Sequence, residues 1–204
     1  MTPEEFLRIL SKGAELKKAT RHCYTDDSRK ESVADHSWRT ALMAMLLSGE
    51  SEFQTIDMNK VIQMCLIHDL GEAFTGDIPT FEKTQADTNT EDNLFFDWVN
   101  SFPLPQKEEW LKLLREMNQM ETLEAKTYKA LDKLEAVISH NESDISTWIP
   151  LEYDLQLTYG KENVQFSEYL KSLSNCIDDW TRKKIKDSYV AESIINPDYQ
   201  TGNC

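Results

Sequence analysis

Residues 61–72 read Val-Ile-Gln-Met-Cys-Leu-Ile-His-Asp-Leu-Gly-Glu, and this stretch decides the fold. Its first seven residues are apolar almost all round, which indicates a helix buried in a helical core. The pair His68-Asp69 closes that helix, where a bare carboxylate is too costly unless it is protonated, paired or bound to a cation. At 100° per residue, His68 and Glu72 share one face if the helix continues through Gly71.

Two interpretations of His68-Asp69 stay open on the residues alone. In the first, Asp69 caps a neighbouring helix and His68 makes an ordinary core hydrogen bond; in the second, both bind a metal. His36, early in another apolar helix, is by itself more typical of a structural core histidine. Two buried histidines and an aspartate within the first seventy residues favour a metal. Imidazole and carboxylate together suit Mn²⁺, Co²⁺, Zn²⁺ or Fe²⁺.

The rest of the chain is predicted to be helical, because Gly and Pro number only six each among 204 residues. Thr2 with Glu5, Ser32 with Asp35, and Asp57 are start signals of helices. The expected helices are 3–18, 32–47, 58–70, 94–99, 106–118, 122–140 and 166–186. We expect the helix over 32–47, apolar on every side from residue 41 to 47, to be buried.

Three segments are predicted to lie outside the helices. Residues 20–31 and 82–93 are polar and are expected to form loops. Residues 151–160 alternate apolar and polar side chains, which suits a short strand or an irregular segment. The tail from about residue 190 is expected to be loose. With no repeat and no low-complexity linker, one all-α domain is the simplest organisation.

The net charge of −14 argues against a DNA or RNA partner, since a domain this acidic repels a nucleic-acid backbone. Any phosphate site must therefore be locally positive. A basic stretch within residues 17–30 is the candidate for that site, although charge alone favours a solvated basic face. Its members are Lys17, Lys18, Arg21, His22, Arg29 and Lys30.

Four cysteines without regular spacing are typical of free thiols in a reducing compartment. The N-terminus shows no signal segment, and no apolar run approaches the length of a membrane span. We therefore expect a cytoplasmic protein without a membrane partner. The cysteines are Cys23, Cys65, Cys176 and Cys204.

Three further carboxylates are either candidate site residues or solvated acids. Glu72 and Asp77 follow the His68-Asp69 pair in a loop with tight turns, where they can orient water or take a proton, or remain solvated loop acids. Asp132 lies about 100° off the apolar stripe of residues 130–138, so periodicity predicts that it is solvated.

The order His36, His68-Asp69, Asp132 resembles the pattern of the HD-domain phosphohydrolases. The phrase over residues 67–79, Ile-His-Asp-Leu-Gly-Glu-Ala-Phe-Thr-Gly-Asp-Ile-Pro, is similar to their 5′-deoxynucleotidase branch. Residues 31–36 (Glu-Ser-Val-Ala-Asp-His) and the helix around Asp132 extend the resemblance. It covers residues 5–140, about two-thirds of the chain.

The resemblance implies an all-α helical bundle with a single buried divalent-metal site. His36, His68, Asp69 and Asp132 would be the ligands, and the ion Mn²⁺, Co²⁺, Zn²⁺, Fe²⁺ or Mg²⁺. Residues 1–140 would form the core, and 141–204 a helical extension packed on it with a loose tail. The resemblance also suggests a homodimer.

The resemblance further implies roles for the residues around the metal. Glu72 would orient or activate the attacking water, Asp77 would contact the sugar, and Arg21 the phosphate or sugar. Glu116 lies near the position of a substrate-contacting acid. His22 stands where these enzymes carry a tryptophan that excludes the 2′-hydroxyl, so His22 is a candidate contact that puts deoxyribose selectivity in question.

The function implied is metal-dependent removal of the 5′-phosphate from (deoxy)nucleoside monophosphates, which makes a small nucleotide the partner. An HD-type triphosphohydrolase or a cyclic-nucleotide phosphodiesterase is the first alternative. Two-metal phosphodiesterases need additional histidines, whereas this chain has four, and His22 and His140 lie outside any second histidine cluster. Further alternatives are a non-catalytic nucleotide sensor that contains a metal and a helical scaffold whose core histidines are satisfied without one.

Overall fold

Helices α2 (Val33–Leu47), α3 (Met58–Ile67) and α7 (Leu123–Glu142) pack against one another and form the centre of the molecule. The computed structural model describes residues 1–25 and 29–195, with side chains up to residue 189. Ala44, Ala125 and Ala130 are fully buried at 0% exposure, and these small side chains permit close approach of the helices. The central trio therefore brings residues far apart in sequence into contact.

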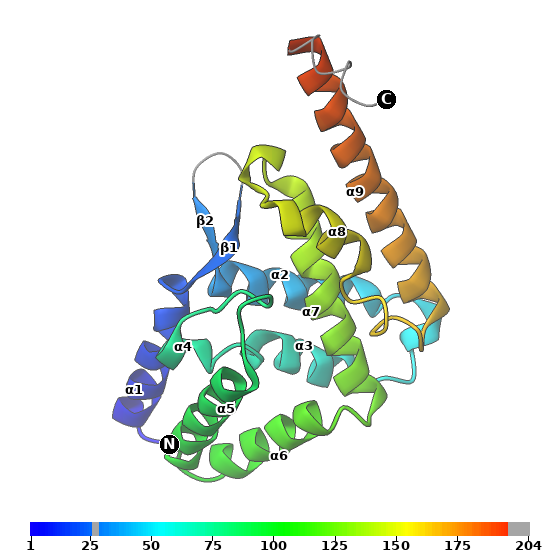
Figure 1. Ribbon diagram of the computed structural model, residues 1–204. Coiled ribbons are helices and arrows are strands. Elements are labelled where there is room, and N and C mark those ends of the chain that lie inside the picture. The colour runs from blue at the N-terminus through cyan, green and yellow to red at the C-terminus, as the bar shows by residue number, and fades with distance from the viewer. Residues whose placement is uncertain (26–28, 196–204) are drawn as a thin grey trace.

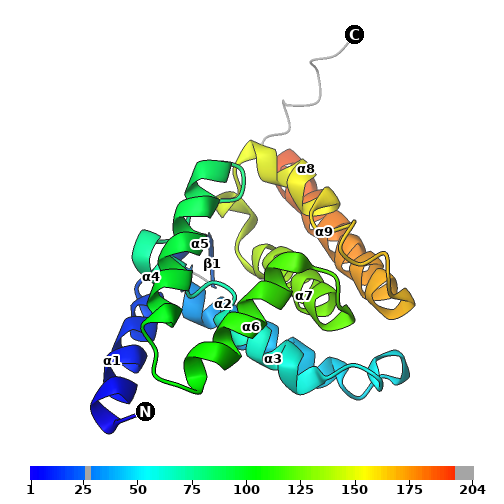
Figure 2. The same ribbon diagram turned by 90° about the horizontal axis from the view of Figure 1, so that it is seen from below.

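The remaining elements surround this trio, with α7 lying between α2 and α3 on one side and α8 and α9 on the other (Figures 1 and 2). They are α1 (Pro3–Gly13), α4 (Glu72–Thr75), α5 (Gln85–Asn100), α6 (Gln106–Gln119), α8 (Pro150–Thr158) and α9 (Glu168–Ile195). Short 3₁₀ turns cover Ala14–Lys17, Ser51–Phe53 and Ile145–Thr147. The all-α class predicted from the sequence is confirmed.

The three helix starts predicted from capping residues are confirmed in atomic detail. The Thr2 hydroxyl accepts the Glu5 amide while the Glu5 carboxylate accepts the Thr2 amide, and Ser32 and Asp35 repeat this capping box. Asp57 caps α3 by accepting the amide of Lys60. These local rules place the first turns of the two helices that supply the candidate site.

Three predicted loop or strand segments differ from the structure. Residues 20–31 are not all loop, because Thr20–Tyr24 (β1) pairs antiparallel with Lys30–Ser32 (β2). Helix α5 begins at Gln85, nine residues earlier than expected, because Thr84 and Asp87 form a capping box. The predicted loose tail includes residues 190–195, which are helical, and residues 196–204, which lie outside the described part.

The prediction that residues 151–160 form a strand or an irregular segment is wrong for residues 151–158, because α8 covers them. Pro150 at the first helical position and Glu152, whose carboxylate accepts the Ile149 amide at 2.8 Å, start the helix. The buried positions of α8 are Glu152 and Gln156, one turn apart. The alternating pattern misled because this helix buries its polar side chains.

A glycine lets the chain after α8 pass close to α7. Gly160, after α8, has φ +72°, and a β-carbon there would lie 2.6 Å from that of Lys133, so the chain can pass α7 only with glycine.

The expectation that α2 is buried all round is wrong, because Trp38 and Leu46 are 62% and 72% exposed. No helix in the described ranges is long and apolar enough to cross a membrane.

Candidate metal centre and substrate pocket

Four side chains converge where α2, α3 and α7 meet. His36 comes from α2, His68 and Asp69 follow the last turn of α3, and Asp132 comes from α7. His36 Nε2 lies 3.1 Å from His68 Nε2 and 3.2 Å from Asp132 Oδ1. His68 Nε2 lies 3.1 Å from Asp69 Oδ2 and 3.6 Å from Asp132 Oδ1. Such separations are those of ligand atoms around one small cation, whose bonds to nitrogen and oxygen are about 2.0–2.2 Å.

The outward ring nitrogens of the two histidines fix the chemistry of this cluster. His68 Nδ1 lies 2.8 Å from the Cys65 carbonyl, which can only accept, so Nδ1 carries the proton. His36 Nδ1 contacts the Glu135 carboxylate in the same way. In the neutral rings both Nε2 atoms therefore present lone pairs to each other and to two carboxylates. A divalent cation would satisfy all four ligand atoms, so the residues fit a single-metal site.

The carboxylates of this cluster stay ionised. Burial lowers the pKa of His68, but Asp69 and Asp132 outweigh it and raise that pKa to about 10. Burial raises the pKa of Asp69, yet His68 holds it well below its usual range. Two negative charges therefore stand ready for a dication.

Asp132 is only 7% exposed, so the prediction from helix periodicity that it is solvated is wrong. Burial raises its pKa, but Lys129 and Lys133 lead the interactions that hold it well below the usual range. Their ammonium nitrogens lie 2.9 and 3.5 Å from Asp132 Oδ2. Periodicity assumes that a polar side chain seeks water, and this one finds its partners inside the protein.

Glu72, the first residue of α4, is buried beside the cluster at 5% exposure. Its Oε2 atom has no hydrogen-bond partner among the described residues, and Lys83 Nζ lies 3.9 Å from Oε1. Burial and the negative charges of Asp69 and Asp77 raise its pKa to about 10. A solvated loop acid is thereby excluded for Glu72, whose carboxyl can hold a proton or orient water.

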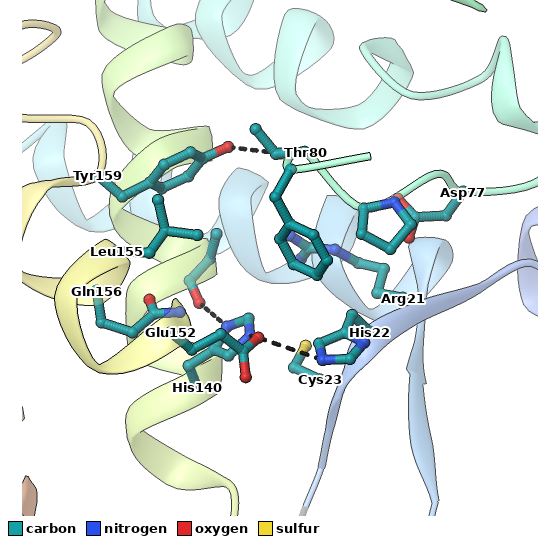
Figure 3. A pocket seen from close by; sticks show the side chains of 13 residues that line it. Arg21, His22, Cys23, Asp77, Thr80, His140, Glu152, Leu155, Gln156 and Tyr159 are labelled. Carbon is teal, nitrogen blue, oxygen red and sulfur yellow. Dashed lines mark hydrogen bonds and ion pairs between the residues drawn. The ribbon is translucent and has the colours of Figure 1, made fainter. Parts of the chain in front are cut away.

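A pocket of about 500 Å³, counting its open mouth, lies between β1, the loop after α4, α7 and α8 (Figure 3). As a cavity the pocket measures about 70 Å³, so much of a nucleotide bound here would lie in its open mouth. Three predicted substrate contacts, Arg21, His22 and Asp77, line it. Asp77 follows Gly76, whose φ is +77°, and its pKa is raised by burial and Asp69 against the opposing effect of Arg21.

Glu116 lies apart from this pocket. Its Oε1 is 2.7 Å from Lys60 Nζ and accepts the Thr122 hydroxyl at the same distance. These contacts join α6 to α3 and to the start of α7. Glu116 is therefore not brought together with the other predicted substrate contacts.

His22 and His140, predicted from the sequence to lie outside any second histidine cluster, both lie near Glu152. Their Nε2 atoms lie 3.3 and 2.9 Å from Glu152 Oε1. This trio is separate from the four-residue cluster and belongs to the wall of the pocket.

A family model described as HD domain matches residues 13–174. The chain belongs to the HD-domain family. It is 31% identical over 144 residues to 5′-deoxynucleotidase HDDC2 of Dictyostelium discoideum, an alignment covering 68% of this chain and 75% of that protein. The human protein of the same name is 27% identical over 142 residues, covering 68% and 66%. The family assignment made from sequence is confirmed.

Among solved structures, this HD-domain chain resembles a predicted metal-dependent phosphohydrolase from Magnetospirillum magnetotacticum. The TM-score is 0.74 at 26% identity, and the match covers 89% of this chain and 93% of that one. The likeness therefore extends beyond residues 5–140, where sequence resemblance ended, into α8 and α9.

Glu135, one turn after Asp132, is a supporting residue of the HD-domain site that sequence reasoning missed. Its carboxylate contacts His36 Nδ1 and lies 3.1 Å from Arg21 Nη1 and 2.5 Å from Arg39 Nε. Glu31, His36 and Glu135 also have ligand-like spacing, but these two guanidinium groups supply the positive charge there. Glu135 therefore orients His36 for the first cluster.

Lys129, Lys133 and Lys83 were missed as well. A signal existed for Lys129, since side chains at i, i+3 on a helix are neighbours and this spacing places it beside Asp132. Lys83 is found only through folding, which brings it to Glu91 at 2.6 Å and toward Glu72.

Replacing Glu72 is expected to stabilise the metal-free protein at alkaline pH. Because the folded pKa of about 10 lies above the ordinary glutamate pKa of 4.5, the unfolded chain releases the proton first as pH rises. The contribution of Glu72 to the free energy of unfolding is fully present below about pH 4.5 and is lost as the pH rises toward 10. Glu72→Gln should therefore raise Tm at pH 8 by roughly 3 °C or more, and by less at pH 5.

Thermal melts of the metal-free protein at both pH values test this expectation. Glu82→Gln, a change at an exposed loop position, is the control and should leave Tm unaltered at both. Equal Tm values for Glu72→Gln and wild type at pH 8 would contradict a buried, protonated Glu72.

Replacing Glu135 by glutamine is expected to weaken metal binding by about tenfold or more, because the His36 ring loses its charged partner. Calorimetric titration of metal-free protein with Mn²⁺ or Zn²⁺ measures the change. Glu142→Gln, which removes another Arg39 partner on the same helix, is the matched control and should bind as wild type does. Unchanged affinity in Glu135→Gln would show that Glu135 does not orient His36.

Proposed function

We propose that this HD-domain protein is a metal-dependent phosphomonoesterase that removes the 5′-phosphate from nucleoside monophosphates. The two imidazole Nε2 atoms, which lie 3.1–3.7 Å from each other and from the carboxylates of Asp69 and Asp132, carry the proposal together with Glu72 buried beside them. The pocket next to this cluster is lined by Arg21, His22 and Asp77, which offer polar contacts to a nucleotide that enters its open mouth. The names of the relatives in slime mould and human, both 5′-deoxynucleotidases, support the same reaction.

His36, His68, Asp69 and Asp132 would hold one divalent ion, which when bound supplies Lewis-acid polarisation of the phosphate and activation of a water. Mn²⁺, Co²⁺, Zn²⁺, Fe²⁺ and Mg²⁺ are all candidates. Glu72 aligns the attacking water and takes its proton. A dication nearby offsets the negative field of Asp69, which is part of what raises the pKa of Glu72.

The side chains around the cluster supply the positive charge that a phosphate needs. Lys129 and Lys133 flank Asp132 on α7, Lys83 lies near Glu72, and Arg21 lies at the pocket. These cations offset locally the net charge of −14, which continues to disfavour polymeric DNA or RNA. Preorganised charge of this kind provides most of the catalysis in phosphoryl transfer.

Phosphate release from deoxyribo- and ribonucleoside 5′-monophosphates tests the proposal. Protein stripped of metal and reloaded with Mn²⁺, Co²⁺, Zn²⁺ or Mg²⁺ should release phosphate, and the ratio of deoxyribo to ribo rates reports on His22. His68→Ala should abolish release by loss of the metal, whereas Glu72→Gln should lower kcat at least 100-fold with the metal retained. Activity only on triphosphates or cyclic nucleotides, or none with metal bound, would overturn it.

We also propose that the protein forms a homodimer through the apolar face of α2. Trp38, Met45 and Leu46 are 62%, 58% and 72% exposed. Trp38 also lines an apolar groove of about 480 Å³, together with Phe6 and Leu10 of α1. Exposed apolar patches of this extent mark interaction sites.

Sedimentation velocity tests this assembly, and wild-type protein should sediment with twice the mass of one chain. Leu46→Glu should convert it to monomer, because a charge enters the apolar face. Leu123→Glu, at an exposed apolar position on α7, should leave it dimeric. A monomeric wild-type protein would contradict the proposal.

A cytoplasmic location is the remaining part of the proposal. Cys23 and Cys65 are buried free thiols and Cys176 is an exposed one, among the described cysteines. Free thiols suit a reducing compartment, which supports this location.

A further inference from the structure

The pocket beside the candidate metal centre has a second wall, formed by α8 and the end of α7. In Figure 3, Leu155, Gln156 and Tyr159 face Arg21 and Asp77 across the pocket. None of the α8 residues belongs to the proposed hydrolytic machinery, yet two of them, Glu152 and Gln156, are polar side chains that a helix rarely buries. Their burial calls for a purpose other than packing.

The distance between this wall and the candidate metal ligands follows from the rise per residue of α7. Asp132, Ala136 and His140 follow one another at single-turn intervals on one face, so they are separated by about 6 and 12 Å along the axis. Ala136 and His140 both line the pocket. A phosphate held at Asp132 would therefore place the sugar beside the small Ala136 and the base beside His140 and α8.

Glu152 is fully engaged by the protein itself. Its Oε2 accepts the Ile149 amide at 2.8 Å, and its Oε1 lies 2.9 Å from His140 Nε2 and 3.3 Å from His22 Nε2. The carboxylate thus ties α8 to α7, while His22 Nε2 of β1 lies close to it without a hydrogen bond. It fixes the wall in place but offers few vacant acceptor positions.

Gln156, one turn further along α8, differs from Glu152 in this respect. It is 4% exposed and lines the pocket, and no side-chain hydrogen bond to it occurs within the part of the chain that the structure describes. The buried polar atoms that lack a partner in the described part of the chain do not include those of Gln156, so its carboxamide faces the solvent of the pocket. Its donor and acceptor are therefore available to a molecule in the pocket.

We propose that Gln156 is the specificity-determining residue of this pocket and that its carboxamide hydrogen-bonds the edge of the substrate's nucleobase. The proposal rests on the proposed function, because it takes the phosphate to lie at the metal centre. A carboxamide presents a donor and an acceptor side by side, which matches the adjacent acceptor and donor on a base edge.

The apolar residues of the same pocket suit a flat ring. Phe81 and Pro79 come from the loop after α4, and Leu155 and Tyr159 from the opposite wall. Phe81 packs edge-on against His22, with 5.6 Å between ring centroids. A base between these side chains is covered on its faces and has its edge toward Gln156.

Hydrolysis of a panel of nucleoside 5′-monophosphates differing only in the base tests the inference. Wild-type kcat/KM should differ by about tenfold between the best and worst base, the size of a bidentate amide contact. Gln156→Met, which keeps the side-chain volume without the amide, should reduce that ratio to within about threefold, mainly through KM. Gln165→Met, an exposed carboxamide outside the pocket, is the matched control and should keep the ratio.

Calorimetric binding of the same nucleotides to Glu72→Gln and to Glu72→Gln/Gln156→Met separates recognition from turnover. Hydrolysis without base preference, or a preference that Gln156→Met retains, overturns the inference and leaves the proposed function standing. Base-selective binding that Gln156→Met abolishes, without hydrolysis by wild type, supports the inference and overturns the proposed function. Neither selective binding nor hydrolysis overturns both.

Discussion

The structure depends on one electrostatic constraint at the meeting point of α2, α3 and α7. Two imidazole nitrogens lie 3.1–3.7 Å from each other and from two buried carboxylates, whose negative charges need positive charge nearby. The chain maintains this arrangement with Lys129 and Lys133 outside Asp132 and with Glu135 behind His36, itself paired with Arg21 and Arg39. Buried alanines let the helices come close enough for the cluster to form.

The same constraint explains why an acidic chain can serve an anionic substrate. Around the cluster, the buried acids Asp132 and Glu135 and the partly buried Glu91 each lie beside a lysine or an arginine. Most of the net charge of −14 therefore lies elsewhere on the chain. Glu72 is the exception, since Lys83 remains 3.9 Å away and one carboxyl oxygen has no partner among the described residues. A group left poorly satisfied beside a polar cluster is a common mark of chemical function.

Sequence reasoning anticipated the helical class and the caps at Thr2, Ser32 and Asp57, because these follow from local spacing. The family was anticipated from the resemblance of residues 67–79 to a known motif. Sequence reasoning failed for residues that the core buries together with their partners. Asp132 and the polar side of α8 were misjudged because periodicity takes polarity as a sign of solvent. Glu135 and Lys83 acquire their partners only through contacts between distant elements, which no local pattern encodes.

The position of α8 has an evolutionary consequence. The segment that forms the far wall of the pocket follows the last candidate metal ligand in the chain and shares no residue with the hydrolytic cluster. Mutations there can alter which molecule is accepted while the bond-breaking apparatus is inherited unchanged. Paralogues of such a chain can change their substrate preference before they change their reaction. Glu152, which holds α8 against α7, is the α8 position at which a substitution would be tolerated least.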